Sequence, residues 1–137
     1  MTAIDIALPR LQTEEGFRAL PYKDTEGHTT LGYGLNVDAG ISKYAAGALL
    51  KAQLTELDTT LASFRWYQAA NDVRKSVFID IAFNDGVHGL LGFPHMLSAA
   101  ATGDWEVASA QCHVTNPELL GRYETLAHLL LTGVSPP

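Results

Sequence analysis

The chain has 137 residues, of which 47 % are hydrophobic and 18 % are charged, a composition that predicts a globular protein with its own core. Its formal net charge of −6 at pH 7 argues against nucleic-acid binding and against attraction to anionic membranes. The single cysteine, Cys112, excludes an internal disulfide.

The N-terminal segment carries no cluster of basic residues and no long apolar run, so we expect no signal peptide. Apolar residues at helical spacing predict a helix over about 5–15 that stops at Gly16. Pro9 is expected near the first turn of this helix, because a deeper proline would break the hydrogen-bond ladder. Residues 20–36 then read as two short strands joined by a turn at Gly27, the second strand covering 29–34.

Helical periodicity returns in the rest of the chain. Ser42 is the expected N-cap of a long helix, and Asn71 or Asp72 caps another that ends at Gly86. The sum is an α+β fold, mostly helical, with one small antiparallel β-hairpin near the N-terminus. We expect a single domain over 1–137, with a hairpin lobe over about 15–41 and a helical lobe over about 42–133. Shorter helices are expected over about 93–101, 104–111 and 119–131.

Three polar residues lie where these elements begin or end: Glu15 at a helix end, Asp24 in a turn and Thr30 in a strand. Two carboxylates across a groove can divide the work of glycoside cleavage, one donating a proton and the other staying ionised beside water. A hydroxyl can hold that water, because it both donates and accepts hydrogen bonds. By residue type alone, however, most acids at helix ends and turns are solvated surface residues.

The order and spacing of the three residues favour the functional reading. They lie in "EEGFRALPYKDTEGHTTLGYG", which contains an "EG" helix end, a "YKD" turn and a "GxxTxGxG" run. This stretch resembles the phage-type lysozymes, glycoside hydrolase family 24. Weaker likeness continues in "IAFNDGVHGLLGF" and "GRYETLAHLLLTG".

The resemblance implies a muramidase that cleaves the β-1,4 bond between N-acetylmuramic acid and N-acetylglucosamine in peptidoglycan, with inversion and without a cofactor. In that interpretation Glu15 is the general acid. Asp24 places or activates the water, or stabilises the positive charge that develops on the sugar. Thr30 positions the water, and Arg122 stands where the family has an arginine that pairs with the catalytic glutamate.

The resemblance also implies a substrate groove. Leu35 stands where the family often has histidine, so any polar contact of that histidine is absent, and Asp85 replaces a residue that is usually apolar. These departures affect the shape of the groove rather than the acid and the water. The residues expected to bind substrate are Gly34, Leu35, Asn36, Phe83 and Asn84.

Other reactive or aromatic residues have simpler interpretations. The five histidines show no metal-ligand spacing, so no metal site is expected. Cys112 is expected to be a small, partly buried side chain rather than a nucleophile. Trp66 and Trp105 could both stack on sugars, but Trp105, at a helix start, is expected to pack in the structure. Tyr22 and Tyr33 remain open between packing and sugar stacking.

Three functions compete. The first is a phage endolysin that waits in the host cytoplasm until a holin opens the membrane to the periplasm or cell wall. The second is the same chemistry delivered as a bacterial antagonism toxin or a tail-associated lysozyme. The third is a catalytically silent wall-binding module, against which the intact Glu15, Asp24 and Thr30 argue. We expect a monomer that acts on peptidoglycan, binds no nucleic acid and does not insert stably into membranes.

Overall fold

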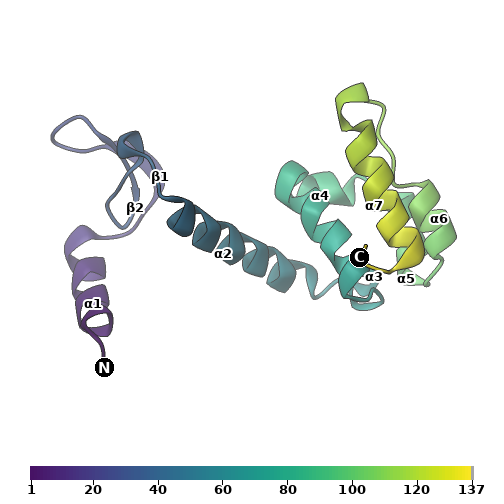
Figure 1. The fold of residues 1–137 in the computed structure, drawn as a ribbon, viewed down its shortest axis with the longest axis horizontal. Coiled ribbons are helices and arrows are strands. Elements are labelled where there is room, and N and C mark those ends of the chain that lie inside the picture. The colour runs from purple at the N-terminus through teal and green to yellow at the C-terminus, as the bar shows by residue number, and fades with distance from the viewer. Residues whose placement is uncertain (137) are drawn as a thin grey trace. The chain divides into compact units, whose positions relative to one another are not determined.

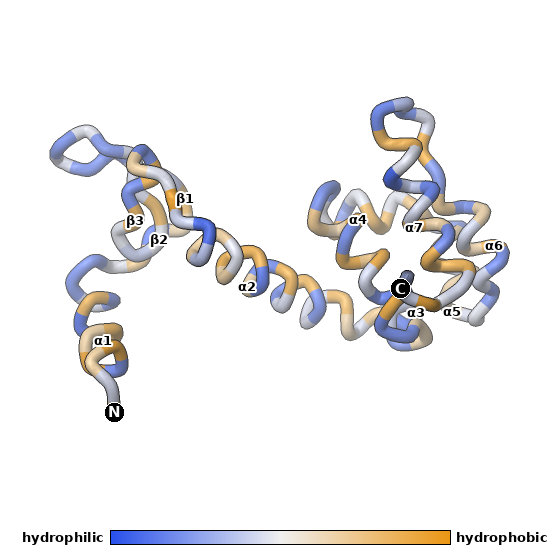
Figure 2. The backbone as a smooth tube through the Cα atoms, viewed as in Figure 1, coloured by the Kyte–Doolittle hydropathy of each residue, from blue (hydrophilic) through white to orange (hydrophobic). Residues whose placement is uncertain are grey.

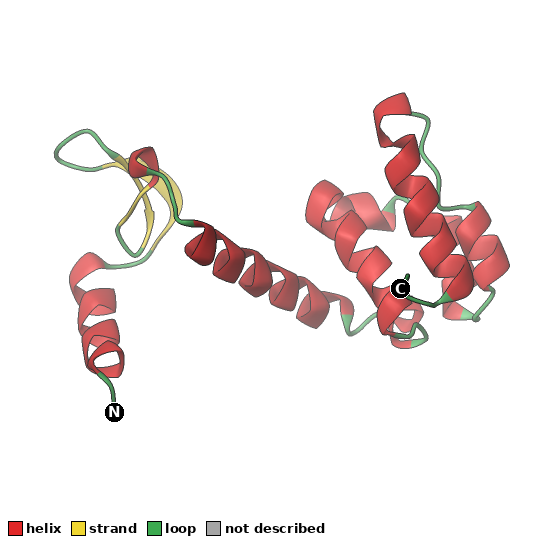
Figure 3. Ribbon diagram, in the orientation of Figure 1, coloured by secondary structure: helices red, strands yellow, loops and turns green. Residues whose placement is uncertain are grey.

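A computed structural model describes residues 1–136 and divides them into two compact units. Residues Met1–Leu49 form one, called here the sheet unit, and the residues from Leu50 onward form the other, called the helical unit. The boundary falls within helix α2 (Lys43–Leu61) (Figure 1). The helices and the one small antiparallel sheet confirm the expected α+β class (Figure 3). That the whole chain acts as a single domain stays a prediction.

The sheet unit begins with helix α1 (Ala3–Glu15). Thr2 caps it in a reciprocal capping box with Asp5, and Gly16, with φ of 69°, ends it. Pro9 lies inside α1 rather than in its first turn, so the expectation for Pro9 was wrong. Because α1 has no buried residue, water can hydrate the Asp5 carbonyl that lacks its usual N–H donor.

Three strands follow, in the antiparallel order β1 (Arg18–Lys23), β2 (Thr29–Gly32) and β3 (Leu35–Asn36). The expected hairpin corresponds to β1 and β2, and β3 adds a third strand to it that the sequence analysis missed. A strand of two residues is too short to show a period of its own, so its pairing is visible only in three dimensions. The 3-10 helix η1 (Val37–Ala39) comes next.

The helical unit contains the later part of α2 and all the remaining helices. The predicted caps are confirmed: Ser42 Oγ accepts from the Ala45 N–H at 3.1 Å, and Asn71 Oδ1 accepts from the Arg74 N–H at 3.0 Å. Gly86, with φ of 76°, interrupts α4 as expected, but the helix resumes beyond it. The elements are α3 (Arg65–Gln68), α4 (Asp72–Leu91), α5 (Pro94–Ala101), α6 (Trp105–Ala110), η2 (Pro117–Leu119) and α7 (Leu120–Thr132).

The core of the helical unit is built on α4. Phe78 is fully buried, and Trp66 packs edge-on against it with ring centroids 5.1 Å apart. Trp105 is half-buried beneath the guanidinium of Arg74, whose Cζ lies 4.4 Å from the ring centroid. Both tryptophans therefore pack in the structure, as was expected for Trp105. Within the same core, burial raises the pKa of the Cys112 thiol to about 12.

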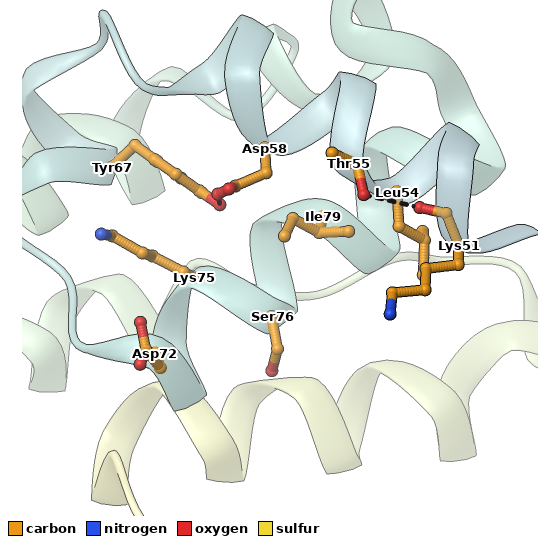
Figure 4. A pocket seen from close by; sticks show the side chains of 9 residues that line it. All are labelled: Lys51, Leu54, Thr55, Asp58, Tyr67, Asp72, Lys75, Ser76 and Ile79. Atoms are coloured by element: carbon orange, nitrogen blue, oxygen red, sulfur yellow. Dashed lines mark hydrogen bonds between the residues drawn. The ribbon is translucent and has the colours of Figure 1, made fainter. Parts of the chain in front are cut away.

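α2 is held to the helical unit at its C-terminal end. Leu61 is its one buried residue, although apolar residues recur along the whole helix (Figure 2). The hydroxyl of Tyr67 in α3 donates to Asp58 of α2 at 2.5 Å, beside a surface pocket of about 340 Å³ (Figure 4). Burial, and then this bond, raise the pKa of Tyr67 well above its ordinary value. Within residues 1–136, no helix has both the length and the apolar composition needed to cross a membrane.

Candidate active site

The three residues expected to be catalytic all lie in the sheet unit. Glu15 is the last residue of α1, Asp24 follows the last residue of β1, and Thr30 lies in β2, the central strand. Each therefore sits on or beside regular structure, which fixes its backbone. Thr30 is the only buried polar residue of the part of the chain that the structure describes.

Asp24 is held by the turn that follows it. Its Oδ1 accepts hydrogen bonds from the N–H groups of Glu26, at 2.9 Å, and His28, at 2.8 Å. Such a turn is the expected conformation for the sequence "DTEG", because an aspartate side chain readily binds backbone N–H groups two or more residues ahead. The His28 bond is the main cause that lowers the pKa of Asp24 below its usual value of 3.8. The carboxylate is thus kept ionised, as its expected role requires.

The backbone of His28 links Asp24 to Thr30. Its N–H binds the carboxylate of Asp24, and its carbonyl accepts from the Thr30 hydroxyl at 3.3 Å. Thr30 also pairs with Tyr22 of β1 and Asn36 of β3, which fixes its place in the sheet. Because any residue has these backbone groups, residue type could not reveal their role.

Glu15 lies against Gly34. A Cβ built on Gly34 would stand 2.6 Å from Oε2 of Glu15 and 3.0 Å from its Cδ, so only glycine leaves room for the carboxyl group. Gly34 also has φ of 76°, a conformation that side chains disfavour. The other two sheet-unit residues expected to bind substrate form β3. Asn36 Oδ1 accepts from the Ala39 N–H at 3.2 Å and caps η1, whereas Leu35 is exposed.

Three further predicted residues meet in the helical unit. Phe83, Asn84 and Arg122 line one pocket of about 390 Å³. Phe83 is 43 % exposed, so its ring is available to a ligand. The rest of the lining is mainly apolar and consists of Leu50, Leu54, Ser76, Ile79 and Asp80.

Arg122 is paired with Asp80 of α4. Its Nε lies 3.2 Å from Asp80 Oδ1, and its Nη2 binds the same oxygen. This hydrogen bond raises the pKa of Arg122 further. The expected pairing of Arg122 with Glu15 stays a prediction. Asp80 was missed, although its position four residues before Asn84 on a predicted helix was a usable signal.

Asp85, the departure from the family pattern, also has a partner. The hydroxyl of Tyr123 donates to its Oδ2 at 3.0 Å. Burial of the phenol, and then this bond, raise the pKa of Tyr123 to about 12. Asp85 thus joins α4 to α7 through a hydrogen bond where an apolar residue would pack. The residues described by the structure contain no cluster of three or more side chains suited to hold a metal ion.

The arrangement in the sheet unit suits proton transfer and water activation. Glu15 supplies an exposed carboxyl group, and Asp24 supplies an ionised carboxylate whose Oδ2 is left without a backbone donor. Oδ2 has the Nδ1 of His28 at 3.6 Å as its neighbour. Thr30 keeps the lone pairs of its hydroxyl while it donates to His28. These are the groups needed for acid–base cleavage of a glycoside.

Comparison with known proteins agrees with this reading. A family model described as "Phage lysozyme" matches residues 12–122, which include Glu15, Asp24, Thr30 and Arg122. The chain is also 27 % identical, over an alignment of 155 positions including gaps, to the "Pre-baseplate central spike protein Gp5" of Enterobacteria phage T4. That alignment covers 90 % of this chain and 27 % of the spike protein, so the chain spans about a quarter of that relative's length. The chain belongs to the phage lysozyme family.

Proposed function

We propose that this protein is a peptidoglycan hydrolase that cleaves the β-1,4 bond between N-acetylmuramic acid and N-acetylglucosamine. One observation carries the proposal. The family match spans a sheet unit in which the backbone of His28 holds both Asp24 and Thr30, while Gly34 leaves space for Glu15.

In the proposed reaction Glu15 protonates the glycosidic oxygen as the bond breaks. Asp24 remains ionised and accepts a proton from water, or stabilises the oxocarbenium-like charge, and Thr30 holds that water. The water attacks from the opposite face of the sugar, so the product is inverted at the anomeric carbon. Arg122 orients the carboxyl group of Glu15, as the resemblance implies. Residues of the pocket around Phe83 and Asn84 bind the glycan.

Mass spectrometry of purified cell wall after incubation with the protein tests the activity and the bond together. We expect muropeptides with N-acetylmuramic acid at the new reducing end. NMR of the fresh product reports its anomeric configuration. The Glu15→Gln variant cannot donate a proton, so its turnover should fall at least about a hundredfold while its melting temperature stays the same. If Glu15→Gln with an unchanged melting temperature clears cell wall at the wild-type rate, Glu15 is not the acid.

Two delivery routes fit this activity. In the endolysin route, the protein accumulates inside the host and reaches the wall through a holin lesion. In the tail-associated route, it is part of the particle, and the similarity to a central spike protein favours this second candidate. Immunodetection in purified virions and in the cleared lysate separates them. Protein that co-purifies with virions supports the tail-associated route, and protein found only in the lysate supports the endolysin.

A further inference from the structure

Asp80 is the polar centre of the pocket that contains Phe83, Asn84 and Arg122. Its Oδ1 accepts from both Nε and Nη2 of Arg122, which is 42 residues away in the sequence. The side-chain amide of Asn84 donates to the Asp80 carbonyl at 2.8 Å and lies 3.5 Å from Oδ1. One residue of α4 therefore contacts both Asn84, which the family resemblance places in the substrate groove, and Arg122, which it assigns to the catalytic glutamate.

The geometry of the guanidinium shows what this contact leaves free. Arginine presents its donors along two edges, one made by Nε and Nη2 and the other by Nη1 and Nη2. Asp80 takes the first edge, so the second stays available to another carboxylate or to a sugar oxygen. A guanidinium held along one edge loses less conformational freedom when a second group binds.

The charges around Arg122 come from few side chains. Asp80 is the carboxylate bonded to it, while Asp85 and Tyr123 act on it from a greater distance and are hydrogen-bonded to each other. The α2 residues lining the pocket, Leu50 and Leu54, are apolar, and so is Leu119 of η2 in the adjoining hollow. Asp80 is therefore the main group that balances the positive charge of Arg122.

We propose that Asp80 is a positioning residue: its carboxylate orients Arg122 for the substrate groove and balances the arginine's charge there. The catalytic consequence rests on the proposed function. An uncompensated arginine near a general acid favours the ionised, inactive form of that acid. Asp80 would thus let Arg122 orient the acid without driving off the proton that the reaction needs.

The orientation is tested directly by NMR of the Arg122 Nε–H group. Two charge-assisted bonds should slow its exchange with water, and Asp80→Asn should speed that exchange by roughly tenfold. Glu124→Gln is the matched control, because Glu124 is exposed on the same helix and its side chain has no hydrogen bond or ion pair within residues 1–136. Equal exchange in wild type and Asp80→Asn would overturn the proposal, whatever the activity of the protein.

The catalytic consequence is tested by the pH dependence of cell-wall hydrolysis. The alkaline limb reports loss of the proton from the acid, so Asp80→Asn should move this limb to lower pH, by about one unit. Asp80→Glu keeps the negative charge, so its alkaline limb should lie close to that of the wild type. In an Arg122→Met background, Asp80→Asn should move the limb by a clearly smaller amount, because only the direct effect of the Asp80 charge remains and no arginine is left to be oriented.

The possible outcomes are distinct. A shift of undiminished size in the Arg122→Met background would mean that Asp80 does not act through Arg122, and the proposal fails. If Glu124→Gln moves the alkaline limb by the same amount, the shift is a general effect of charge, and the proposal also fails. If wild type does not hydrolyse cell wall, the proposed function fails, but the exchange rate of the Arg122 Nε–H still decides whether Asp80 positions Arg122.

Discussion

Gly34 offers a sharp test of the position of Glu15. Alanine at this site would place its Cβ 2.6 Å from Oε2, 3.0 Å from Cδ and 3.3 Å from Cγ of Glu15. Ordinary contact begins at about 3.4 Å, so the whole carboxyl group, not only its outer oxygen, must move by roughly 0.8 Å. A displacement of about 1 Å in a reacting group can cost on the order of a hundredfold in rate. We therefore expect Gly34→Ala to lower the rate of muropeptide release about a hundredfold.

Gly32→Ala is the matched control. Gly32 has φ of 65°, close to the 76° of Gly34, but a Cβ built there meets nothing within 4 Å. Both variants should lose roughly 1–2 kcal/mol of unfolding free energy, because both force alanine into a left-handed conformation. The side chain of Glu15 can swing aside, so its displacement should add little to this loss. Stability should thus be similar in the two variants while activity differs.

The measurements are urea denaturation and hydrolysis of purified wall, made on both variants in the same buffer. Gly32→Ala should keep its rate within about threefold of wild type, since a loss of this size leaves nearly all molecules folded. Comparable rates in Gly34→Ala and Gly32→Ala would refute the reasoning. Either the Glu15 carboxyl group can move without consequence, or it does not take part in the reaction.

Two further predictions concern groups with shifted pKa values or short hydrogen bonds. Because the His28 N–H lowers the pKa of Asp24 in the folded protein, the stability that this carboxylate contributes is present above pH 3.8 and is lost as the pH falls below it. Urea denaturation should therefore show wild type and Asp24→Asn differing most at neutral pH and converging in acid, and a gap that widens in acid would contradict the shift. Tyr67→Phe should lower the unfolding free energy by about 1–2 kcal/mol, because it removes the hydrogen bond that the Tyr67 hydroxyl donates to the charged carboxylate of Asp58. Tyr22→Phe is the control, since the Tyr22 hydroxyl has no hydrogen bond within residues 1–136, and equal losses in both variants would exclude a special role for the Tyr67–Asp58 bond.

Local signals explain which helices could be predicted. Ser42 and Asn71 each mark the start of a helix by their own side chain, and the structure uses both. The prediction for Pro9 was wrong because an exposed helix can leave one carbonyl hydrogen-bonded to water. The residues next to Pro9 in the sequence do not show whether the helix is exposed. Helix α3 was not predicted, because its four residues are too few to show a helical repeat of apolar residues.

The candidate site also contains residues that the sequence could predict and residues that it could not. Glu15, Asp24 and Thr30 lie within sixteen residues of one another, so a spacing pattern could reveal them. The role of His28 could not be predicted from the sequence, because its backbone N–H and carbonyl make the hydrogen bonds and every residue type has a carbonyl. Asp80 and Arg122 lie 42 residues apart on two different helices, and only tertiary structure shows which of several acids lies next to the arginine.

The buried Cys112 gives the helical unit an intrinsic chemical probe. With a pKa of about 12, on the order of one thiol in 10⁵ is ionised at neutral pH, against roughly one in a hundred for an unburied thiol of pKa 9.0. A thiol-specific reagent should therefore label the folded protein at least about a thousandfold more slowly than the opened one. Because the chain has no other cysteine, labelling follows the opening of this unit alone. Comparison of the labelling rate with circular dichroism in rising urea would reveal whether the sheet unit opens at the same time.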